Sequence, residues 1–136
     1  MDFIFMLTRN DRTIEDAASI VGAACELGVR HIGFKDVGVP FATMRDVADR
    51  IRQHGGVSYL EVVSTTSEAV VHSLAAARAL DVDRVLGGTD LDAATRILGG
   101  LGRYFPFPGR PVGHRTQLEG SLELVAADCR ASRAAG

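Results

Sequence analysis

The sequence predicts an α/β fold built from four to five parallel βα units, and three observations support this prediction. Short apolar runs alternate with longer amphipathic stretches at nearly even spacing along the chain. The apolar runs are almost continuous in hydrophobic residues, which is typical of parallel strands covered on both faces. The amphipathic stretches open with a threonine followed three places later by a carboxylate, a pattern of helix N-termini. Strand–helix alternation then implies right-handed crossovers and a parallel sheet.

Five apolar runs are expected to form the strands of this sheet. In chain order they are Phe3–Leu7, His31–Phe34, Ser58–Val63, Arg84–Leu86 and Arg103–Phe107. In an α/β fold the segments that follow the carboxyl ends of the strands gather at one edge, where ligands bind. The residues directly after each run are therefore the first candidates for a functional site.

Helices are expected between these strands, with starts marked by Thr13, Thr43, Thr65 and Thr89. At each start the hydroxyl can accept a hydrogen bond from a free amide, and the carboxylate suits the positive end of the helix dipole. Apolar residues follow the first two starts at helical spacing. They are Ile14, Ala17, Ala18, Val21 and Ala24 in one stripe and Met44, Val47, Ala48 and Ile51 in the next.

The ends of the helices are marked less regularly. Gly28 and Gly55 follow the first two stripes and are expected to end those helices, because glycine readily adopts the left-handed conformation of a helix stop. A fifth helix is expected over Glu119–Arg130. Residues 131–136 then form a short tail that we expect to be disordered.

Parallel βα units form either a closed (βα)8 barrel or an open doubly wound sheet. Closed barrels usually need about 250 residues, and this chain has 136. It is therefore half of a barrel or a small complete open sheet. We expect the first, because the chain stops after its fifth helix without another strand. The prediction is one partial-barrel domain over residues 1–136 that resembles the N-terminal half of a TIM barrel.

Composition limits the function and the location of the protein. The net charge of −2 and the lack of a basic cluster argue against nucleic acid as a partner. No apolar run approaches the ~18 residues of a membrane span, so no membrane partner is expected. Met1–Leu7 lacks the basic start of a signal peptide. Cys25 and Cys129 lie far apart in the sequence, which favours a reducing compartment, and we expect a cytoplasmic protein.

Lys35 is the one lysine of the chain, against fourteen arginines. An amine can lose its proton and act as a nucleophile or base, whereas a guanidinium stays charged. Lys35 follows the second predicted strand, where the fold places ligands. One hypothesis is therefore that Lys35 supplies chemistry that arginine cannot. The alternative is chance and codon bias, with Lys35 as a charge at the mouth of the strand.

Several segments resemble an uncharacterised bacterial family that belongs with the ribulose-phosphate-binding barrels, the class of the isomerase and cyclase of histidine biosynthesis. These segments are Phe3–Asp11, His31–Gly38, Leu60–Val63, Leu86–Thr89 and Tyr104–His114. The resemblance extends from about residue 3 to 130. It implies the fold of the first half of a (βα)8 barrel. Members of the family continue into further strands and glycine-rich phosphate loops, which this chain lacks.

Lys35 and Glu61 follow neighbouring predicted strands and are expected to meet at the mouth of the sheet. A desolvated lysine can form a Schiff base with a carbonyl group or abstract a proton, with Glu61 as its acid–base partner. In the alternative interpretation the two residues form a structural ion pair, and Glu61 keeps Lys35 protonated. Asp36 can orient the lysine or a substrate. The alternative is that Asp36 is simply an acidic residue near the start of a helix, where such residues are common without a functional role.

Two other segments are candidate substrate contacts. Arg9 and Asn10 follow the first strand, where they can bind a substrate or form a surface loop. Gly87, Gly88 and Thr89 allow backbone amides to approach an anion at a helix N-terminus, as in phosphate sites. The same three residues equally suit a tight turn before a capped helix.

The stretch Pro106–His114 contains three prolines and two glycines, which stiffen a loop that presents Arg110 and His114. Such a loop can bind an anion or take part in acid–base chemistry, or it can be a structural turn. No metal cluster or nucleotide-binding motif is present in the sequence, and we expect neither a metal nor another cofactor. The other three histidines, His31, His54 and His72, are expected to be structural.

Two functional hypotheses follow from these residues. In the first, the protein is a lyase or isomerase that acts on a small carbonyl metabolite, with or without a phosphate group, through Lys35. Glu61 is then the acid–base partner, and Arg9 and Arg110 contact an anionic group. In the second, the chain is a non-catalytic half-barrel that self-associates or complements another half, because an incomplete barrel exposes two strand edges. A homo-oligomer is expected on this ground.

Overall fold

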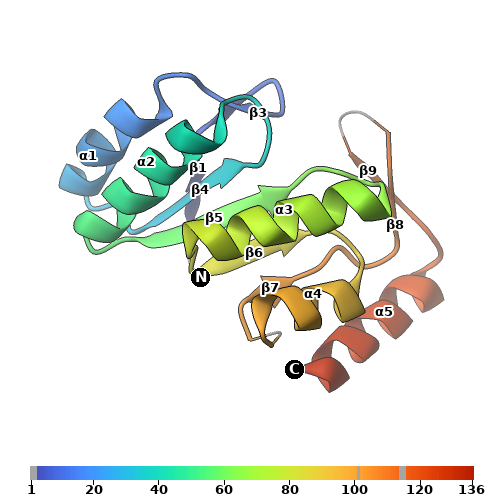
Figure 1. Cartoon of the computed structure of the whole chain (residues 1–136). Helices are drawn as coiled ribbons and strands as arrows, with labels where there is room; N and C mark the ends of the chain where they lie inside the picture. The colour runs from blue at the N-terminus through green and yellow to red at the C-terminus, as the bar shows by residue number, and fades with distance from the viewer. Residues whose placement is uncertain (1–2, 101, 114–115) are drawn as a thin grey trace.

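The computed structural model describes residues 3–100, 102–113 and 116–136 (Figure 1). In this part of the chain, five parallel strands form one sheet whose spatial order follows the sequence. They are β1 (Ile4–Met6), β4 (His31–Lys35), β5 (Val57–Val62), β6 (Arg84–Gly87) and β7 (Tyr104–Phe105). The predicted α/β fold of parallel βα units is thus confirmed. The sheet is open, with β1 and β7 at its edges, so closure into a barrel stays a prediction.

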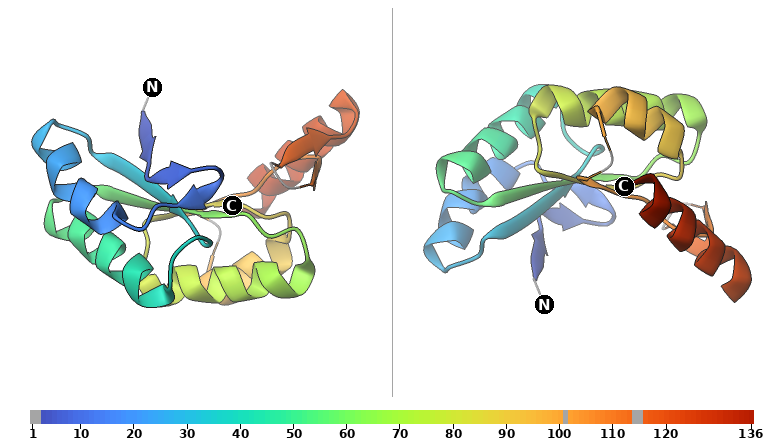
Figure 2. Two further views of the ribbon diagram at one scale, coloured as in Figure 1. Left: turned by 90° about the horizontal axis from the view of Figure 1, so that it is seen from above. Right: turned by 90° about the horizontal axis from the view of Figure 1, so that it is seen from below.

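Four helices cover one face of this sheet (Figure 2): α1 (Ala17–Glu26), α2 (Phe41–Gln53), α3 (Ser67–Leu80) and α4 (Leu91–Leu98). Two short antiparallel hairpins project beyond the sheet. The first pairs β2 (Thr8–Arg9) with β3 (Arg12–Thr13), and the second pairs β8 (Arg110–Val112) with β9 (Gln117–Glu119). The last helix, α5 (Leu122–Ala135), follows the second hairpin.

The core lies between the sheet and the helices. Phe34 of β4 and Leu60 of β5 are fully buried there, beneath the helical stripe predicted from the sequence. That stripe is confirmed in α2, where Met44, Val47, Ala48 and Ile51 are all buried. It is confirmed in part in α1, where Ala17, Val21 and Ala24 are buried and Ile14 precedes the helix. Burying these side chains is the main favourable contribution to folding.

The opposite face of the sheet differs from the expectation that both faces are covered. Ile4, Met6 and Leu86 on this face are only partly buried, and Phe105 is 47% exposed. Right-handed crossovers between strands in sequential order place every intervening helix on the same side, which explains the difference. We refer to this surface as the open face, defined by Ile4, Met6, Leu86 and Phe105.

The four predicted helix starts are displaced in the structure. Thr13 lies in β3, and Thr43 lies inside α2, which begins after Pro40. Before α3 the side chain of Thr66, rather than Thr65, accepts a hydrogen bond from the Ala69 amide. Before α4 the capping residue is Asp90 in place of Thr89. The pattern identified the right regions, but a competing polar residue or a proline fixed the cap itself.

The predicted helix stops and the end of the chain have different outcomes. Gly28 and Gly55 lie two residues beyond α1 and α2 with φ angles of 87° and 69°, which confirms their role as helix stops. Residues 131–135, expected in a disordered tail, belong to α5. None of the helices in the described residues is long and apolar enough to cross a membrane.

Candidate functional site

Lys35 and Glu61 lie side by side at the carboxyl end of the sheet. Lys35 is the last residue of β4 and pairs in register with Glu61 of β5. In a parallel sheet, residues in register point to the same side, and these two point toward the open face rather than the helices. The predicted meeting of Lys35 and Glu61 is therefore present in the structure.

A third charged residue joins them from the first hairpin. Asn10 and Asp11 form the two-residue loop between β2 and β3, with φ angles of 51° and 65°. Positive φ at both positions is required by the tightest hairpin turns, and Asn and Asp tolerate it better than other residues with a side chain. The turn holds the Asp11 carboxylate against the Lys35 ammonium group.

The hydroxyl of Thr13 fixes this hairpin to the end of β4. Its Oγ1 accepts a hydrogen bond from the Lys35 backbone amide at 2.7 Å and donates one to the Lys35 carbonyl at 2.8 Å. Thr13 is buried, so both bonds are shielded from water. A side chain at Gly38 would collide with the Thr13 backbone, so this glycine allows β3 to dock closely. The position of Asp11 thus depends on contacts with β4 and the segment after it.

The three charged side chains form a cluster, Asp11–Lys35–Glu61, with the amine innermost. Lys35 Nζ donates hydrogen bonds to Asp11 Oδ1 and, at 3.1 Å, to Glu61 Oε1. The Lys35 side chain is 9% exposed, whereas those of Asp11 and Glu61 are each 23% exposed. The carboxylates therefore meet solvent while the ammonium group lies behind them.

The pKa of Lys35 reflects two opposing effects. Burial acts to lower it, because desolvation disfavours the charged form. The hydrogen bonds to Asp11 and Glu61, together with the negative charges of these carboxylates, outweigh burial and raise the Lys35 pKa above its ordinary value. Lys35 is thus a charged ammonium group at neutral pH.

A cavity of about 680 Å³ opens in front of the cluster. Its lining residues come from the first hairpin, from β5 and from the region of the second hairpin. They are Asn10, Asp11, Glu61, Phe107, Pro111, Thr116 and Leu118. Volumes of a few hundred to about 1,000 Å³ are typical of sites for small molecules.

The other predicted contacts are divided around this cavity. Asn10 lines it, as the prediction of a substrate contact requires. Arg9 is exposed and lines a second depression, which shares Asn10 with this cavity. Arg110 is exposed on β8 and is not among the lining residues. His114 lies outside the described residues.

Asp36 points away from the cluster and has structural partners. Its carboxylate accepts hydrogen bonds from the Val63 amide at 3.1 Å and from the Ser73 hydroxyl of α3. These bonds connect the ends of β4 and β5 to a helix on the covered face. The arrangement gives Asp36 a role in holding the strand ends rather than in orienting Lys35.

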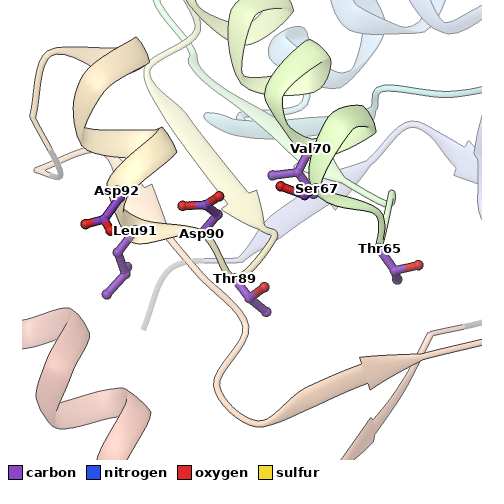
Figure 3. Close-up of a pocket in the computed structure, with 7 residues that line it drawn as sticks. All are labelled: Thr65, Ser67, Val70, Thr89, Asp90, Leu91 and Asp92. Carbon is purple, nitrogen blue, oxygen red and sulfur yellow. The ribbon is translucent and has the colours of Figure 1, made fainter.

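Of the three residues predicted to contact an anion, Gly87 and Gly88 adjoin Phe107 beside the cavity of the cluster, whereas Thr89 lines another cavity. Thr89 lines a cavity of about 550 Å³ at the N-termini of α3 and α4 (Figure 3). The carboxylates of Asp90 and Asp92 also line it, and Asp90 accepts a hydrogen bond from the Ala93 amide at 2.8 Å. An anion here would meet two negative charges and would compete with Asp90 for a helix amide.

Asp11 is the member of the cluster that we did not select from the sequence. A signal for it is present, because an Asn–Asp pair between two short polar strands suits a two-residue hairpin. The sequence did not indicate that this hairpin folds back over the end of β4. The lining residues Phe107 and Thr116 were not selected either, since they belong to a loop and a hairpin of little regular pattern.

Comparisons with known proteins give no support for or against these assignments. No protein-family model, curated protein or solved structure matches this chain. Among the described residues, no three His, Cys, Asp or Glu side chains lie together in a way that could hold a metal ion. The function must therefore be argued from the cluster and its cavity.

Proposed function

We propose that the protein is an isomerase or lyase that acts on a small carbonyl metabolite through the cluster Asp11–Lys35–Glu61. The observation that carries this proposal is the arrangement of a buried ammonium group between two carboxylates that front a cavity of about 680 Å³. Charged groups that lie together in a cleft are characteristic of catalytic sites. The proposal also includes the relationship to the ribulose-phosphate-binding barrels that the sequence resembles.

The cluster contains the groups needed to move a proton next to a carbonyl group. The Glu61 carboxylate accepts a proton from the carbon beside the carbonyl, and the electron pair of that C–H bond forms a C=C bond. The carbonyl π electrons move onto oxygen, and the Lys35 ammonium group behind the two carboxylates stabilises the negative charge through its own positive charge. In an α-hydroxy carbonyl compound, the former carbonyl carbon then takes up a proton while the hydroxyl group on the other carbon loses its proton and becomes the new carbonyl group, which gives the isomer. Where the next carbon carries a leaving group, the bond to that group breaks with its electron pair instead, which gives the lyase product.

The charge of Lys35 favours one of the two chemistries expected of it. A Schiff base requires a neutral amine, and the raised Lys35 pKa leaves little neutral amine at pH 7. Proton transfer assisted by an ammonium group requires the charged form that the carboxylates favour. An ammonium group has three N–H donors, and Asp11 and Glu61 account for two of them. We therefore propose proton transfer.

Deuterium exchange tests this function directly. The protein is incubated in D2O with small aldehydes and ketones, with and without phosphate, and loss of the C–H signal beside the carbonyl is followed by NMR. We expect catalysed exchange with at least one compound. Glu61→Gln and Lys35→Met should each slow this exchange by about 100-fold or more, the range of a lost acid–base group.

Glu26→Gln is the matched control, since Glu26 is an exposed carboxylate at the end of α1. It should leave the exchange rate unchanged, and circular dichroism should show that every variant is folded. Exchange that survives both Glu61→Gln and Lys35→Met, or no exchange with any compound, would contradict the proposal. An adduct on Lys35 trapped by borohydride would replace proton transfer with Schiff-base chemistry.

The open face favours a second candidate function, that of a half-barrel which associates with a second copy or a complementary half. Strand order follows chain order, and the unpaired outer edges of β1 and β7 flank this face. Exposed strand edges and exposed aromatic side chains are typical sites of association. Phe105, at 47% exposure, lies where such a contact would form. The two functions are compatible, because the cluster lies at the carboxyl end of the same face.

A further inference from the structure

The cavity in front of the cluster has one polar and one apolar wall. The polar wall is formed by Asn10 and Asp11 of the first hairpin and Glu61 of β5. The apolar wall is formed by Phe107 and by residues of the second hairpin, Pro111 and Leu118. The walls come from segments far apart in the sequence, so the cavity is assembled by the fold.

The charge of the polar wall is negative. Asp11 and Glu61 carry two negative charges and the Lys35 ammonium group behind them carries one positive charge, which leaves one negative charge. Among the described lining residues there is no cationic side chain. The two arginines expected to bind an anion, Arg9 and Arg110, are exposed and are not among these lining residues. This wall therefore repels a phosphate group and accepts hydrogen bonds from hydroxyl groups.

The apolar wall adds a second requirement. Phe107 packs against Gly87 at the end of β6, where a side chain would collide with the aromatic ring. The Phe107 amide also donates a hydrogen bond to the Gly88 carbonyl at 2.9 Å. These contacts hold Phe107 in place in the cavity that Asp11 and Glu61 also line. An aromatic face is electron-rich and attracts polarised C–H groups as well as apolar surface.

We propose that this cavity binds an uncharged polyhydroxy aldehyde or ketone, that is, a sugar without a phosphate group. Its hydroxyl groups donate to Asp11, Glu61 and the Asn10 carbonyl oxygen, and its C–H face contacts Phe107. The inference rests on the proposed function and specifies its substrate class. The sequence alone did not determine whether the substrate carries a phosphate group.

Paired ligands test this inference in the full chain. Binding of D-erythrose and D-ribose is compared with that of their terminal phosphate esters by NMR titration of the ¹⁵N-labelled protein. The neutral sugars should shift the amides of Asn10, Asp11 and Glu61. The esters should bind at least about tenfold more weakly, a factor that corresponds to ~1.4 kcal/mol.

Removal of the negative charge should change this preference. In Glu61→Gln the wall loses one negative charge, and the ratio of the Kd of the ester to the Kd of the neutral sugar should fall severalfold. Asp92→Asn is the matched control, because Asp92 is a carboxylate of the cavity in Figure 3, and it should leave the ratio unchanged. Circular dichroism establishes that both variants are folded.

Three outcomes would overturn the inference. The first is that the esters bind as tightly as the neutral sugars. The second is that no sugar shifts the amide signals of Asn10, Asp11 or Glu61. The third is that D-glucosamine, titrated as an amine-bearing sugar, binds and the neutral sugars do not, which would indicate an amine ligand. Failure of the proposed function is a separate result. Neutral sugars that bind without deuterium exchange would contradict proton transfer only. Exchange confined to phosphate esters would contradict the ligand class only.

Discussion

At the scale of single residues, the central feature is the Lys35 ammonium group, whose positive charge is paired with two carboxylates. Lys35 is almost fully buried, and an unpaired charge in such a position costs several kcal/mol. Asp11 and Glu61 offset this cost through hydrogen bonds and opposite charge. Arginine at this position would present a larger, planar group to carboxylates placed for a compact one. The geometry thus gives a physical reason for lysine here that does not depend on codon usage.

The titration of Lys35 can be measured without interference from other lysines. Selective ¹³C labelling of lysine gives a single Cε resonance, because the chain has one lysine. We expect its midpoint above the ~10.4 of a free lysine. Glu61→Gln and Asp11→Asn should each lower this midpoint, since each removes a charge and weakens a hydrogen bond to Nζ. A midpoint below that of a free lysine would contradict the charged state on which the proposed proton transfer depends.

The raised pKa also predicts how Lys35 contributes to stability. Its folded-state pKa lies above its unfolded value, so the contribution is complete below the unfolded pKa and is lost as the pH rises through the folded pKa. In the same labelled protein, urea unfolding between pH 8 and 12 should show this loss only at the alkaline end. Lys35→Met lacks the amine, so the part of the alkaline loss of stability that is due to deprotonation of Lys35 should be absent in this variant.

At the scale of elements, the local sequence pattern predicted the strands and the helical stripes. Contacts between residues far apart in the sequence determined the role of Thr13 and the position of the first hairpin. The stripe of α2 and the position of β4, except for its last residue Lys35, follow from hydrophobic periodicity alone. Thr13 shows where that approach fails, because its hydroxyl binds the Lys35 backbone, twenty-two positions away in sequence, instead of capping a helix. For the same reason Lys35 and Glu61 could be paired from strand order, whereas Asp11 could not.

Removing the hydroxyl of Thr13 should loosen the first hairpin. Thr13→Val keeps the size of the side chain but leaves the Lys35 amide and carbonyl without this partner, which should cost about 1–3 kcal/mol of unfolding free energy. Thr65→Val, at an exposed position before α3, is the control and should change stability little. Urea denaturation measures both variants. Equal stability of Thr13→Val and the wild type would show that the hydroxyl does not anchor β3.

At the scale of the whole molecule, four helices on one face leave an asymmetric sheet. The covered face carries the core, and the open face carries Phe105, whose ring lies under the Arg84 guanidinium group at 5.6 Å. A barrel would bury the open face against further strands, and an association would bury it against another chain. This asymmetry is the structural basis of the predicted homo-oligomer.

Paired phenylalanine variants separate these surfaces. Phe105→Glu places a charge on the open face, and Phe41→Glu places one on α2, where Phe41 is 40% exposed. If the chain self-associates through the open face, analytical ultracentrifugation should show a dimer or larger species for the wild type and for Phe41→Glu. Phe105→Glu should shift toward the monomer. A monomeric wild type, or equal behaviour of the two variants, would be evidence against association through the open face.

The sequential strand order also bears on how fast the chain can fold. Each strand pairs with the one formed just before it in the sequence, so every new pairing closes a loop of only one βα unit. The entropy lost on closing a loop rises with its length, and folding rates rise as contacts become more local. The sheet can therefore grow unit by unit from β4 and β5, its longest strands. Asp11 requires the completed end of β4, so the cluster should form only after this part of the sheet has folded.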